Sequence, residues 1–282
     1  MVLALASLRR IPRYLRNLSM PKHPQVSILI PTIGRKECLS KCLQSINNQS
    51  FTDYELILEE EEGSLTKIRN QAAKKAKGEY LVFIDDDVIT TEDWLKSIVG
   101  AFSFGDVFGV SGPSVIPDRN RKERDLFKWK KIKMLYDALF LGRRASLPGH
   151  FTKSGAWTTG ACDESCRYQG EVEFLEACNM SYRRDVFEQV GGFDESYKGI
   201  GDWSEPDLSF RVRKLGGRLI FIQGAKLYHF PSRSGAYKKR KADSGNRLGN
   251  YMLFSKRWIK PCFSHSLYKL FMRSYYAYKT IE

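Results

Sequence analysis

The chain of 282 residues lacks any apolar run close to the roughly 18 residues that a membrane-spanning helix needs. It also lacks the order of a secretory signal, because the arginines near the N-terminus follow a short apolar run instead of preceding it. These absences argue against an integral membrane protein and against a secreted one. We therefore expect the protein in the cytoplasm.

Cysteine and histidine are arranged too sparsely for a structural zinc site. The six cysteines include two C-x3-C pairs, and neither has the C-x2-C spacing with matched Cys or His partners. A disulfide between Cys162 and Cys166 is one interpretation of the second pair, and reduced cytosolic thiols are the simpler one.

Acidic residues are scarce in three segments. Residues 1–22 carry five basic and no acidic side chains, residues 118–144 carry ten and four, and residues 233–282 carry twelve and two. Because these segments sum to +21 and the whole chain carries +14, the remaining residues are net acidic. Basic segments around an acidic body indicate a polyanionic partner, which is an anionic membrane surface, a nucleic acid or an anionic glycan. Ordinary solvated charge is the alternative.

The segment 1–22 has the pattern of an amphipathic helix that lies on a membrane surface. Four of its apolar residues fall within an arc of about 80° on a helical wheel, with four arginines on the opposite side. The apolar residues are Leu8, Ile11, Leu15 and Leu18. Pro12 would kink such a helix.

Two further segments stand apart from the core in composition. Residues 118–150 are basic and aromatic without a clean amphipathic face, which predicts a mobile or membrane-facing insertion. Residues 233–282 are expected to form a basic, aromatic C-terminal tail.

Residues 23–232 predict one α/β domain. Hydrophobic residues at 42% and aromatic residues at 13% of the chain fit a globular core. Strands and helices alternate with short connections, which predicts parallel strands in a doubly wound sheet. The first strands are predicted at VSILIPT, YELILEE and YLVFIDDD, and the first helices at KECLSKCLQSINNQ and LTKIRNQAAKKA.

Three aspartates, Asp85, Asp86 and Asp87, follow the third predicted strand directly. Ligands of doubly wound sheets bind beyond the carboxyl ends of the strands, and like charges this close repel unless a cation meets them. The run therefore predicts a divalent metal site, with a solvated acidic turn as the alternative.

Glu205 lies in the first turn of a predicted helix. The helix dipole there keeps a carboxylate ionised, as a general base must be. The alternative is a capping role beside an Asp207–Arg211 ion pair at i,i+4 spacing. His229 ends the last predicted strand and is suited to bind a metal through its neutral imidazole, although a lone histidine is more often structural.

Taken in order, these segments resemble the inverting family 2 glycosyltransferases of the GT-A fold. The match runs from about Val26 to Phe230 and is most specific in EACNMSYRRDVFEQVGGFDESY and SEPDLSFRVRKLGGRLIFIQGAKLYH. The family's pattern there is an Asn in a small-residue turn, a Gly-Gly-Phe-Asp turn, an acidic pair before a helix and a late histidine. The resemblance implies a single GT-A domain with a central, mostly parallel sheet, flanked by the basic N- and C-terminal segments.

The resemblance also implies roles for individual residues. Glu205 takes the place of the catalytic base, and Asp87 and His229 take the places of the ligands of Mn²⁺ or Mg²⁺. The residues implied to bind the nucleotide-sugar are Pro31, Thr32, Arg35, Glu60, Arg69, Asp85, Asp86 and Asn179.

The implied reaction moves a sugar from a nucleotide-sugar, a UDP-sugar by default, to an acceptor hydroxyl with inversion, in polysaccharide or glycoconjugate synthesis. Glu205 would remove the proton of the hydroxyl during a single in-line displacement. The implied partners are the donor, a glycan or lipid-linked acceptor, and an anionic membrane surface. The protein would associate peripherally with the cytoplasmic face of that membrane.

Two other functions are weighed against this one. A nucleotidyltransferase of sugar-phosphates would typically carry a Gly-rich phosphate loop after the first strand, and PTIGRKE has one glycine there. A nucleic-acid-binding protein would carry basic residues on its folded core, which here is net acidic. No nucleic acid is therefore expected as a partner.

Overall fold

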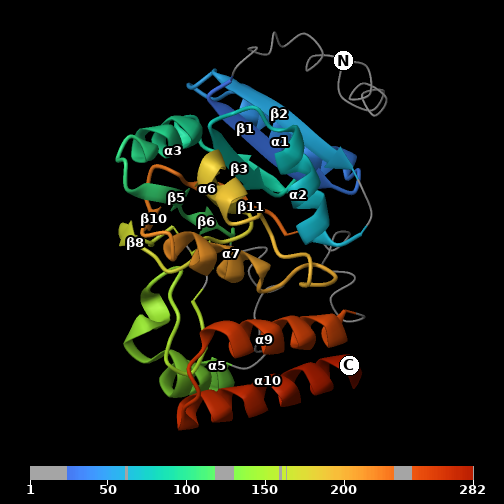
Figure 1. Ribbon diagram of the computed structural model, residues 1–282, viewed down its shortest axis with the longest axis vertical. Coiled ribbons are helices and arrows are strands. Elements are labelled where there is room, and N and C mark those ends of the chain that lie inside the picture. The colour runs from blue at the N-terminus through green and yellow to red at the C-terminus, as the bar shows by residue number, and fades with distance from the viewer. Residues whose placement is uncertain are drawn as a thin grey trace.

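The computed structural model describes residues 24–60, 63–117, 130–158, 161–162, 164–231 and 243–281. Figure 1 shows a sheet covered by helices in its upper part and a layer of helices at its lower end, which includes α9 (Ser244–Trp258) and α10 (Phe263–Ile281). The predicted amphipathic segment 1–22 lies outside the described residues, as do parts of the predicted insertion and tail.

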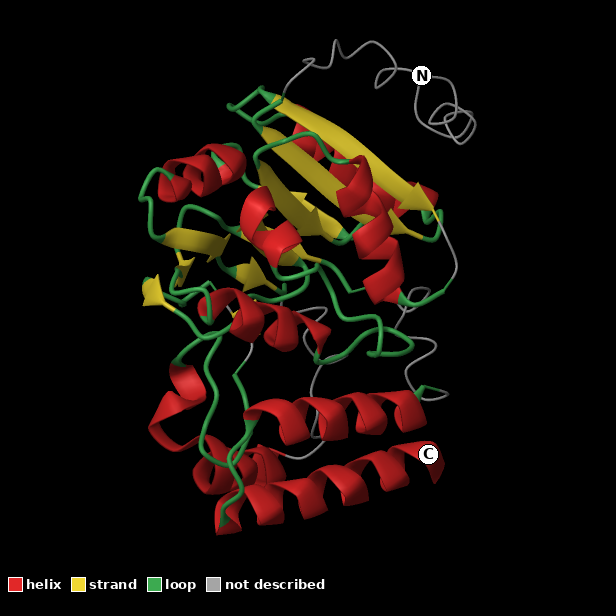
Figure 2. Cartoon of the chain, viewed as in Figure 1, coloured by secondary structure: helices red, strands yellow, loops and turns green. Residues whose placement is uncertain are grey.

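The described residues contain strands that form two sheets (Figure 2). The strands of the larger sheet are β1 (Val26–Thr32), β2 (Tyr54–Glu60), β3 (Tyr80–Ile84), β5 (Val107–Ser111), β8 (Gly170–Glu171), β9 (Asn179–Arg183) and β10 (Arg218–Phe221). Those of the smaller sheet are β4 (Val88–Thr90), β6 (Ser114–Val115), β7 (Ala161–Cys162) and β11 (Leu227–His229).

The larger sheet is mixed, with the strand order β2-β1-β3-β9-β5-β10-β8. β1 pairs in parallel with β2 and β3, and β5 pairs in parallel with β10. β9 runs antiparallel between β3 and β5, and β8 runs antiparallel to β10. The predicted mostly parallel sheet is thus corrected to a mixed one, because a strand from far along the chain inserts at its centre.

Helices cover both faces of this sheet. They are α1 (Lys36–Asn47), α2 (Leu65–Lys75), α3 (Trp94–Phe102), α6 (Arg184–Gln189) and α7 (Ser204–Arg213). Ile28 and Ile30 of β1 belong to the core with α1 and α3, and Leu29 belongs to the core with α2, α6 and α7. Burial of both faces explains why the central strands are nearly continuous hydrophobic runs in the sequence.

The three strands and two helices predicted first are all present. The run VFGVSGPSVI is divided between β5 and β6, which belong to different sheets. Gly112 lies at the division, where a Cβ atom would come within 2.3 Å of the carbonyl oxygen of Ala225. The chain can pass this close to another backbone only without a side chain.

The C-terminal residues form a packed layer of helices where the sequence predicted a tail. α5 (Lys130–Tyr136), a π-helical turn η3 (Asp137–Leu141) and a 3-10 turn η4 (Gly142–Ser146) lie with α9 and α10 at the lower end (Figure 1). An aromatic core joins this layer to the sheet domain. The ring of Trp203 packs at a tilt against Tyr251 and Phe254 of α9, at 5.0 and 5.2 Å between ring centroids. Within the described ranges, none of the helices has both the length and the apolar character needed to cross a bilayer.

Candidate functional site

A cleft of about 230 Å³ opens where β1 and β3 end. Its walls come from the loop after β1, the start of α2, residues 174–178, the end of β11 and the first turn of α7. This is the edge of the sheet at which the sequence placed the ligand. The cleft therefore collects residues from nearly the whole length of the domain.

The aspartate run is held at the mouth of β3 by the loop after β1. Thr32 Oγ1 donates a hydrogen bond of 2.6 Å to Asp86 Oδ2, and the Arg35 guanidinium contacts both Asp86 and Asp87. The Arg35 Nη1 atom lies 2.9 Å from Asp87 Oδ2. Because β1 and β3 are parallel neighbours, their ends bring these side chains together.

His229 reaches the same place from the smaller sheet. β11 pairs with β4 so that His229 lies opposite Val88, and the backbone N–H of Phe230 donates to the carbonyl of Asp87 at 2.9 Å. The His229 Nε2 atom is 3.2 Å from Asp87 Oδ1 and 4.0 Å from Asp85 Oδ2. The two sheets thus place a histidine beside the aspartates that precede it by more than half the chain.

Asp85, Asp87 and His229 form a donor set that fits a divalent cation. One ligand atom from each lies within 4.8 Å of the others. Carboxylate oxygens suit Mg²⁺ and Mn²⁺, and imidazole adds a nitrogen donor of the kind that first-row transition metals accept. Three protein ligands leave coordination positions for the oxygens of a phosphorylated ligand.

Glu205 lies on the other side of the cleft, joined to the aspartates by Arg69. Arg69 in α2 is 1% exposed; its Nη1–H donates to Glu205 Oε1 at 2.7 Å, and its Nη2 lies 3.8 Å from Asp85 Oδ1. One buried cation thus links the predicted base to the predicted metal site.

The two carboxylates differ in their affinity for a proton. Burial raises the pKa of Glu205, and the charge of Arg69 opposes this effect without cancelling it. Burial also opposes the ionisation of Asp87, but His229 and Arg35 outweigh it and hold the pKa of Asp87 below its usual range. Asp87 is thus suited to remain an ionised ligand, whereas Glu205 is suited to accept a proton.

Six of the residues predicted to bind the donor line the cleft, and two do not. The six are Pro31, Thr32, Arg35, Arg69, Asp85 and Asp86. Glu60 lies exposed at the end of β2, outside the cleft lining. Asn179 is fully buried in β9, where its amide bonds Trp94 Nε1 and the carbonyls of Gly112 and Ala225. In the structure the amide of Asn179 thus holds neighbouring strands together.

Several further residues line the cleft. Asp202 lines it and forms an ion pair with Arg247 of α9, and Glu176 lines it from the loop before β9. Trp203 adopts a left-handed backbone with φ of 78°, which is uncommon for a residue with a side chain. The short run Gly-Asp-Trp before Glu205 is the one local signal, and no periodicity marks it.

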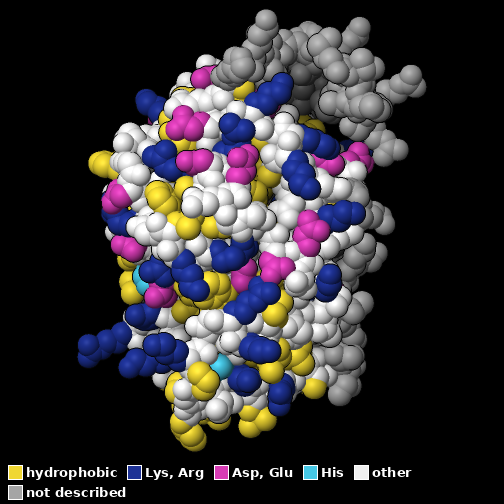
Figure 3. Space-filling view, in the orientation of Figure 1, with side chains coloured by type: hydrophobic (Ala, Val, Ile, Leu, Met, Phe, Trp, Pro, Cys, Tyr) yellow, Lys and Arg dark blue, Asp and Glu magenta, His cyan; other side chains and the backbone are white. Residues whose placement is uncertain are grey.

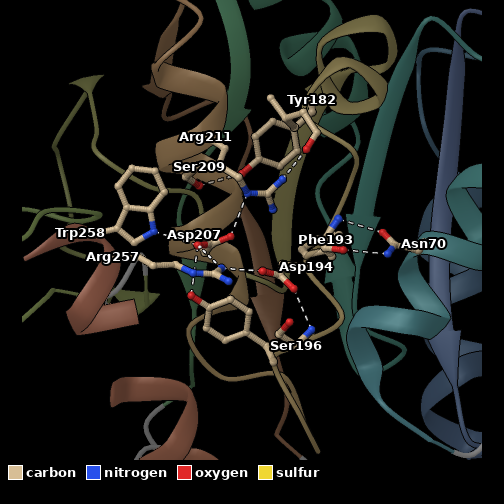
Figure 4. Close-up of polar contacts among 12 residues, drawn as sticks. Asn70, Tyr182, Phe193, Asp194, Ser196, Asp207, Ser209, Arg211, Arg257 and Trp258 are labelled. Carbon is tan, nitrogen blue, oxygen red and sulfur yellow. Dashed lines mark hydrogen bonds and ion pairs between the residues drawn. The ribbon is translucent and has the colours of Figure 1, made fainter. Parts of the chain in front are cut away.

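Asp207, two residues beyond Glu205, does not line the cleft and lies in a buried polar network (Figure 4). Its carboxylate accepts hydrogen bonds from Tyr197 Oη at 3.1 Å and from Trp258 Nε1 at 2.8 Å. It also pairs with Arg211 at 2.9 Å and with Arg257 at 3.3 Å. The predicted Asp207–Arg211 pair is confirmed, and its carboxylate is committed to joining α7 to α9.

Replacing Asp207 with Ala is expected to lower the free energy of unfolding by about 3 kcal/mol, because it leaves buried donors and guanidinium groups without their acceptor. Urea denaturation measures this change. The control is Asp106→Ala, which removes a surface pair with Arg218 and should leave the midpoint unchanged. An unchanged midpoint for Asp207→Ala would show that the network does not hold α9 on the domain.

The chain is similar in sequence to known glycosyltransferases. The sequence matches the profile of glycosyl transferase family 2 over residues 57–191, a range that contains Arg69 and the three aspartates but not Glu205 or His229. It is 23% identical to the glucosyl-dolichyl phosphate glucuronosyltransferase of Haloferax volcanii over 240 residues, which cover 73% of this chain and 69% of that protein.

Two solved structures are similar in fold. The mannosyltransferase PcManGT of Pyrobaculum calidifontis, in complex with GDP-Man and Mn²⁺, has a TM-score of 0.53 at 16% identity, covering 99% of this chain and 79% of that one. GalNAc-T7 with UDP, GalNAc and Mn²⁺ has a TM-score of 0.54 at 14% identity, covering 93% of this chain and 56% of that one. These similarities confirm the predicted GT-A fold in a single domain.

Proposed function

The chain belongs to glycosyl transferase family 2, and from this membership we propose that it builds a polysaccharide or glycoconjugate by moving a sugar from a nucleotide-sugar to an acceptor hydroxyl. We propose that the anomeric configuration inverts. The observation that carries the proposal is the pairing, across one cleft, of a proton-accepting Glu205 with a cluster of two aspartates and a histidine.

Glu205 is proposed to accept the proton of the acceptor hydroxyl as that oxygen attacks the anomeric carbon. Burial raises the pKa of Glu205, which makes proton transfer more favourable than for an ordinary glutamate, and the charge of Arg69 favours its ionised form. The attack comes from the face opposite the leaving nucleotide, so inversion follows from a single displacement. The proposal needs no covalent intermediate.

Asp85, Asp87 and His229 would hold the cation. Bound there, Mn²⁺ or Mg²⁺ would supply positive charge to stabilise the leaving diphosphate. Thr32 and Arg35 order the aspartate run from the loop after β1. These contacts fix the ligand oxygens before the donor arrives, so less ordering remains to be done during the reaction.

The donor is proposed to bind along the loop after β1 and the aspartate run, where Pro31, Thr32 and Arg35 line the cleft. A UDP-sugar remains the first candidate. The similar structures carry UDP in one case and GDP-Man in the other, so both nucleotides belong in a binding test.

The acceptor is proposed to be a glycan or a lipid-linked sugar, and the enzyme to work on the cytoplasmic face of an anionic membrane. A curated relative, by its name, acts on a glucosyl-dolichyl phosphate, which is a lipid-linked sugar. The acid-poor segments of the sequence support the same partner, since basic side chains are attracted to anionic lipid.

Binding of one nucleoside diphosphate with Mn²⁺ is expected to raise the melting temperature of the protein by about 5 °C at a hundredfold excess over Kd, because the ligand binds the folded state alone. The measurement is a thermal-shift screen of UDP, GDP, dTDP and CMP. Each nucleotide with a chelator in place of Mn²⁺ is the control. If no nucleotide shifts the transition, the proposed donor class is wrong.

A further inference from the structure

Two helical segments at the lower end of the molecule expose six large apolar side chains, which we call the apolar face. Their exposed fractions range from 42% to 87% in the part of the chain that the structure describes. They are Met134 and Leu135 of α5, Leu139 of η3, and Phe263, Leu267 and Leu270 of α10.

The helix α10 is apolar on two sides. Tyr268, Met272 and Tyr276 follow one another at four-residue spacing and are buried in the aromatic core. Phe263, Leu267 and Leu270 follow at four- and three-residue spacing on the outer side. A helix that only covered the domain would carry polar residues there, so this outer row needs a partner of its own.

The exposed rows of α5, η3 and α10 lie on adjacent elements. Tyr136 of α5 and Tyr268 of α10 share a hydroxyl–hydroxyl hydrogen bond of 3.1 Å. The rings of Phe140 and Phe271 lie 5.6 Å apart between centroids. The two segments thus pack side by side, and each leaves a row of apolar side chains exposed.

Positive charge accompanies the apolar face. Residues 130–144 and 263–281 together carry eight Lys and Arg and one acidic residue, Asp137, which pairs with Lys133. Figure 3 shows Lys and Arg side chains among hydrophobic ones at the lower end of the molecule. On α10 itself Lys269 directly precedes Leu270, and Arg273 follows it by three residues. An apolar row with a basic rim matches the boundary between acyl chains and anionic headgroups.

We propose that the apolar face is the surface by which this protein lies on an anionic lipid bilayer. Leu267, Leu270 and Phe263 enter the interface, and the basic side chains contact lipid phosphates. A second copy of the chain is a poorer occupant, since a symmetric pair would bring two basic rims together. The inference deepens the proposed membrane partner by naming the surface that contacts it.

The apolar face is connected to the cleft through ring contacts. Tyr268 of α10 packs against Tyr251 of α9 at 5.9 Å, and Tyr251 packs against Trp203 at 5.0 Å. Trp203 lines the cleft two residues before Glu205. Docking of the apolar face therefore sets the distance of the cleft from the bilayer. This consequence rests on the proposed function, because only a lipid-linked acceptor requires it.

The test is cosedimentation of the full chain with phosphatidylcholine vesicles that contain phosphatidylglycerol, and with phosphatidylcholine alone. Leu267→Gln with Leu270→Gln should weaken binding to the anionic vesicles at least about tenfold, since two exposed leucines no longer enter the interface. Lys269→Gln with Arg273→Gln should weaken it by a similar factor and reduce its dependence on salt. Phe104→Gln, at an aromatic residue 62% exposed elsewhere, is the matched control and should bind as the wild type does.

Wild-type binding by the leucine double variant would overturn the proposal. The proposal would also be overturned if removal of residues 1–22 abolishes vesicle binding while neither double variant changes it. A second copy would be the occupant instead if the wild type does not bind vesicles, runs as a dimer in gel filtration, and becomes a monomer in the leucine double variant. All variants should keep the thermal shift with nucleotide and Mn²⁺, which separates failure of this inference from failure of the proposed function.

Discussion

Replacing Glu205 with Gln is expected to lower turnover about 10²–10⁴-fold. Gln keeps the length of the side chain and an oxygen that can still accept the hydrogen bond from Arg69 Nη1. It cannot accept the proton of an acceptor hydroxyl. The loss should therefore fall on turnover, while affinity for the nucleotide and Mn²⁺ stays nearly unchanged.

The measurement is the rate of nucleoside diphosphate release beside nucleotide affinity, for the wild type and the variant. Glu188→Gln, at an exposed glutamate of α6, controls for the substitution itself. The pH profile adds an independent readout. Activity should fall as pH falls through the pKa of Glu205, and burial raises this pKa, so the acid limb should lie above the range of an ordinary glutamate. Turnover within a few-fold of wild type would remove Glu205 from the mechanism, and Asp202, which also lines the cleft, would be the next base to test.

Replacing Asp87 with Ala is expected to lower turnover by about 10³-fold or more, because a bound cation contributes several kcal/mol of charge stabilisation at a leaving diphosphate. A chelator should inactivate the wild type reversibly, and added Mn²⁺ should restore it. The variant should also lose the thermal shift that a nucleotide produces with Mn²⁺, which separates loss of the site from loss of the base.

Asp93→Ala is the matched control for Asp87→Ala, since it removes an exposed aspartate at the start of α3. It should retain activity and response to Mn²⁺. Full activity of the wild type in excess chelator would contradict the metal role and leave Asp85, Asp87 and His229 as a structural turn beside a strand.

The sequence alone predicted the features that depend on short-range hydrophobic patterns. The buried runs of β1 and β3 and the helices between them could be identified from hydrophobic periodicity, and so could the edge of the sheet where the aspartates emerge. The family resemblance placed Asp87 with His229, and pairing of β11 with β4 brings them together. No local pattern carries that contact, because it depends on which strands become neighbours.

The structure adds what the sequence does not specify, namely which elements become neighbours and which side chains they bury. The antiparallel β9 lies in the middle of the sheet, between β3 and β5. The sequence of a strand does not determine which strands become its neighbours. The family resemblance placed Asn179 at the donor, yet its amide satisfies buried backbone carbonyls. Glu60 ends β2 as predicted but lies outside the cleft, since the sheet alone does not decide how far a side chain reaches.

The C-terminal helices α9 and α10 were not predicted, because their basic and aromatic composition indicated a tail. Residues 263–281 were interpreted from their basic and aromatic composition, and a helix that is apolar on two sides was not predicted there. Their inner row packs on an aromatic core that also contains Trp203, and this connection spans elements far apart in the chain. Only the assembled domain shows that the predicted tail belongs to it.

The central claim is that this cleft transfers a sugar from a nucleotide-sugar with Glu205 as the base, and the nucleotide released by the wild type tests it most directly. The protein is incubated with UDP-, GDP- and dTDP-sugars and Mn²⁺, with and without lipid-linked acceptors, and the products are separated. We predict release of a nucleoside diphosphate from one donor class, increased by an acceptor and nearly abolished in Glu205→Gln. A parallel incubation supplies nucleoside triphosphates and sugar-phosphates instead. Pyrophosphate release there, as a nucleotidyltransferase would produce, with no cleavage of any nucleotide-sugar, would contradict the account.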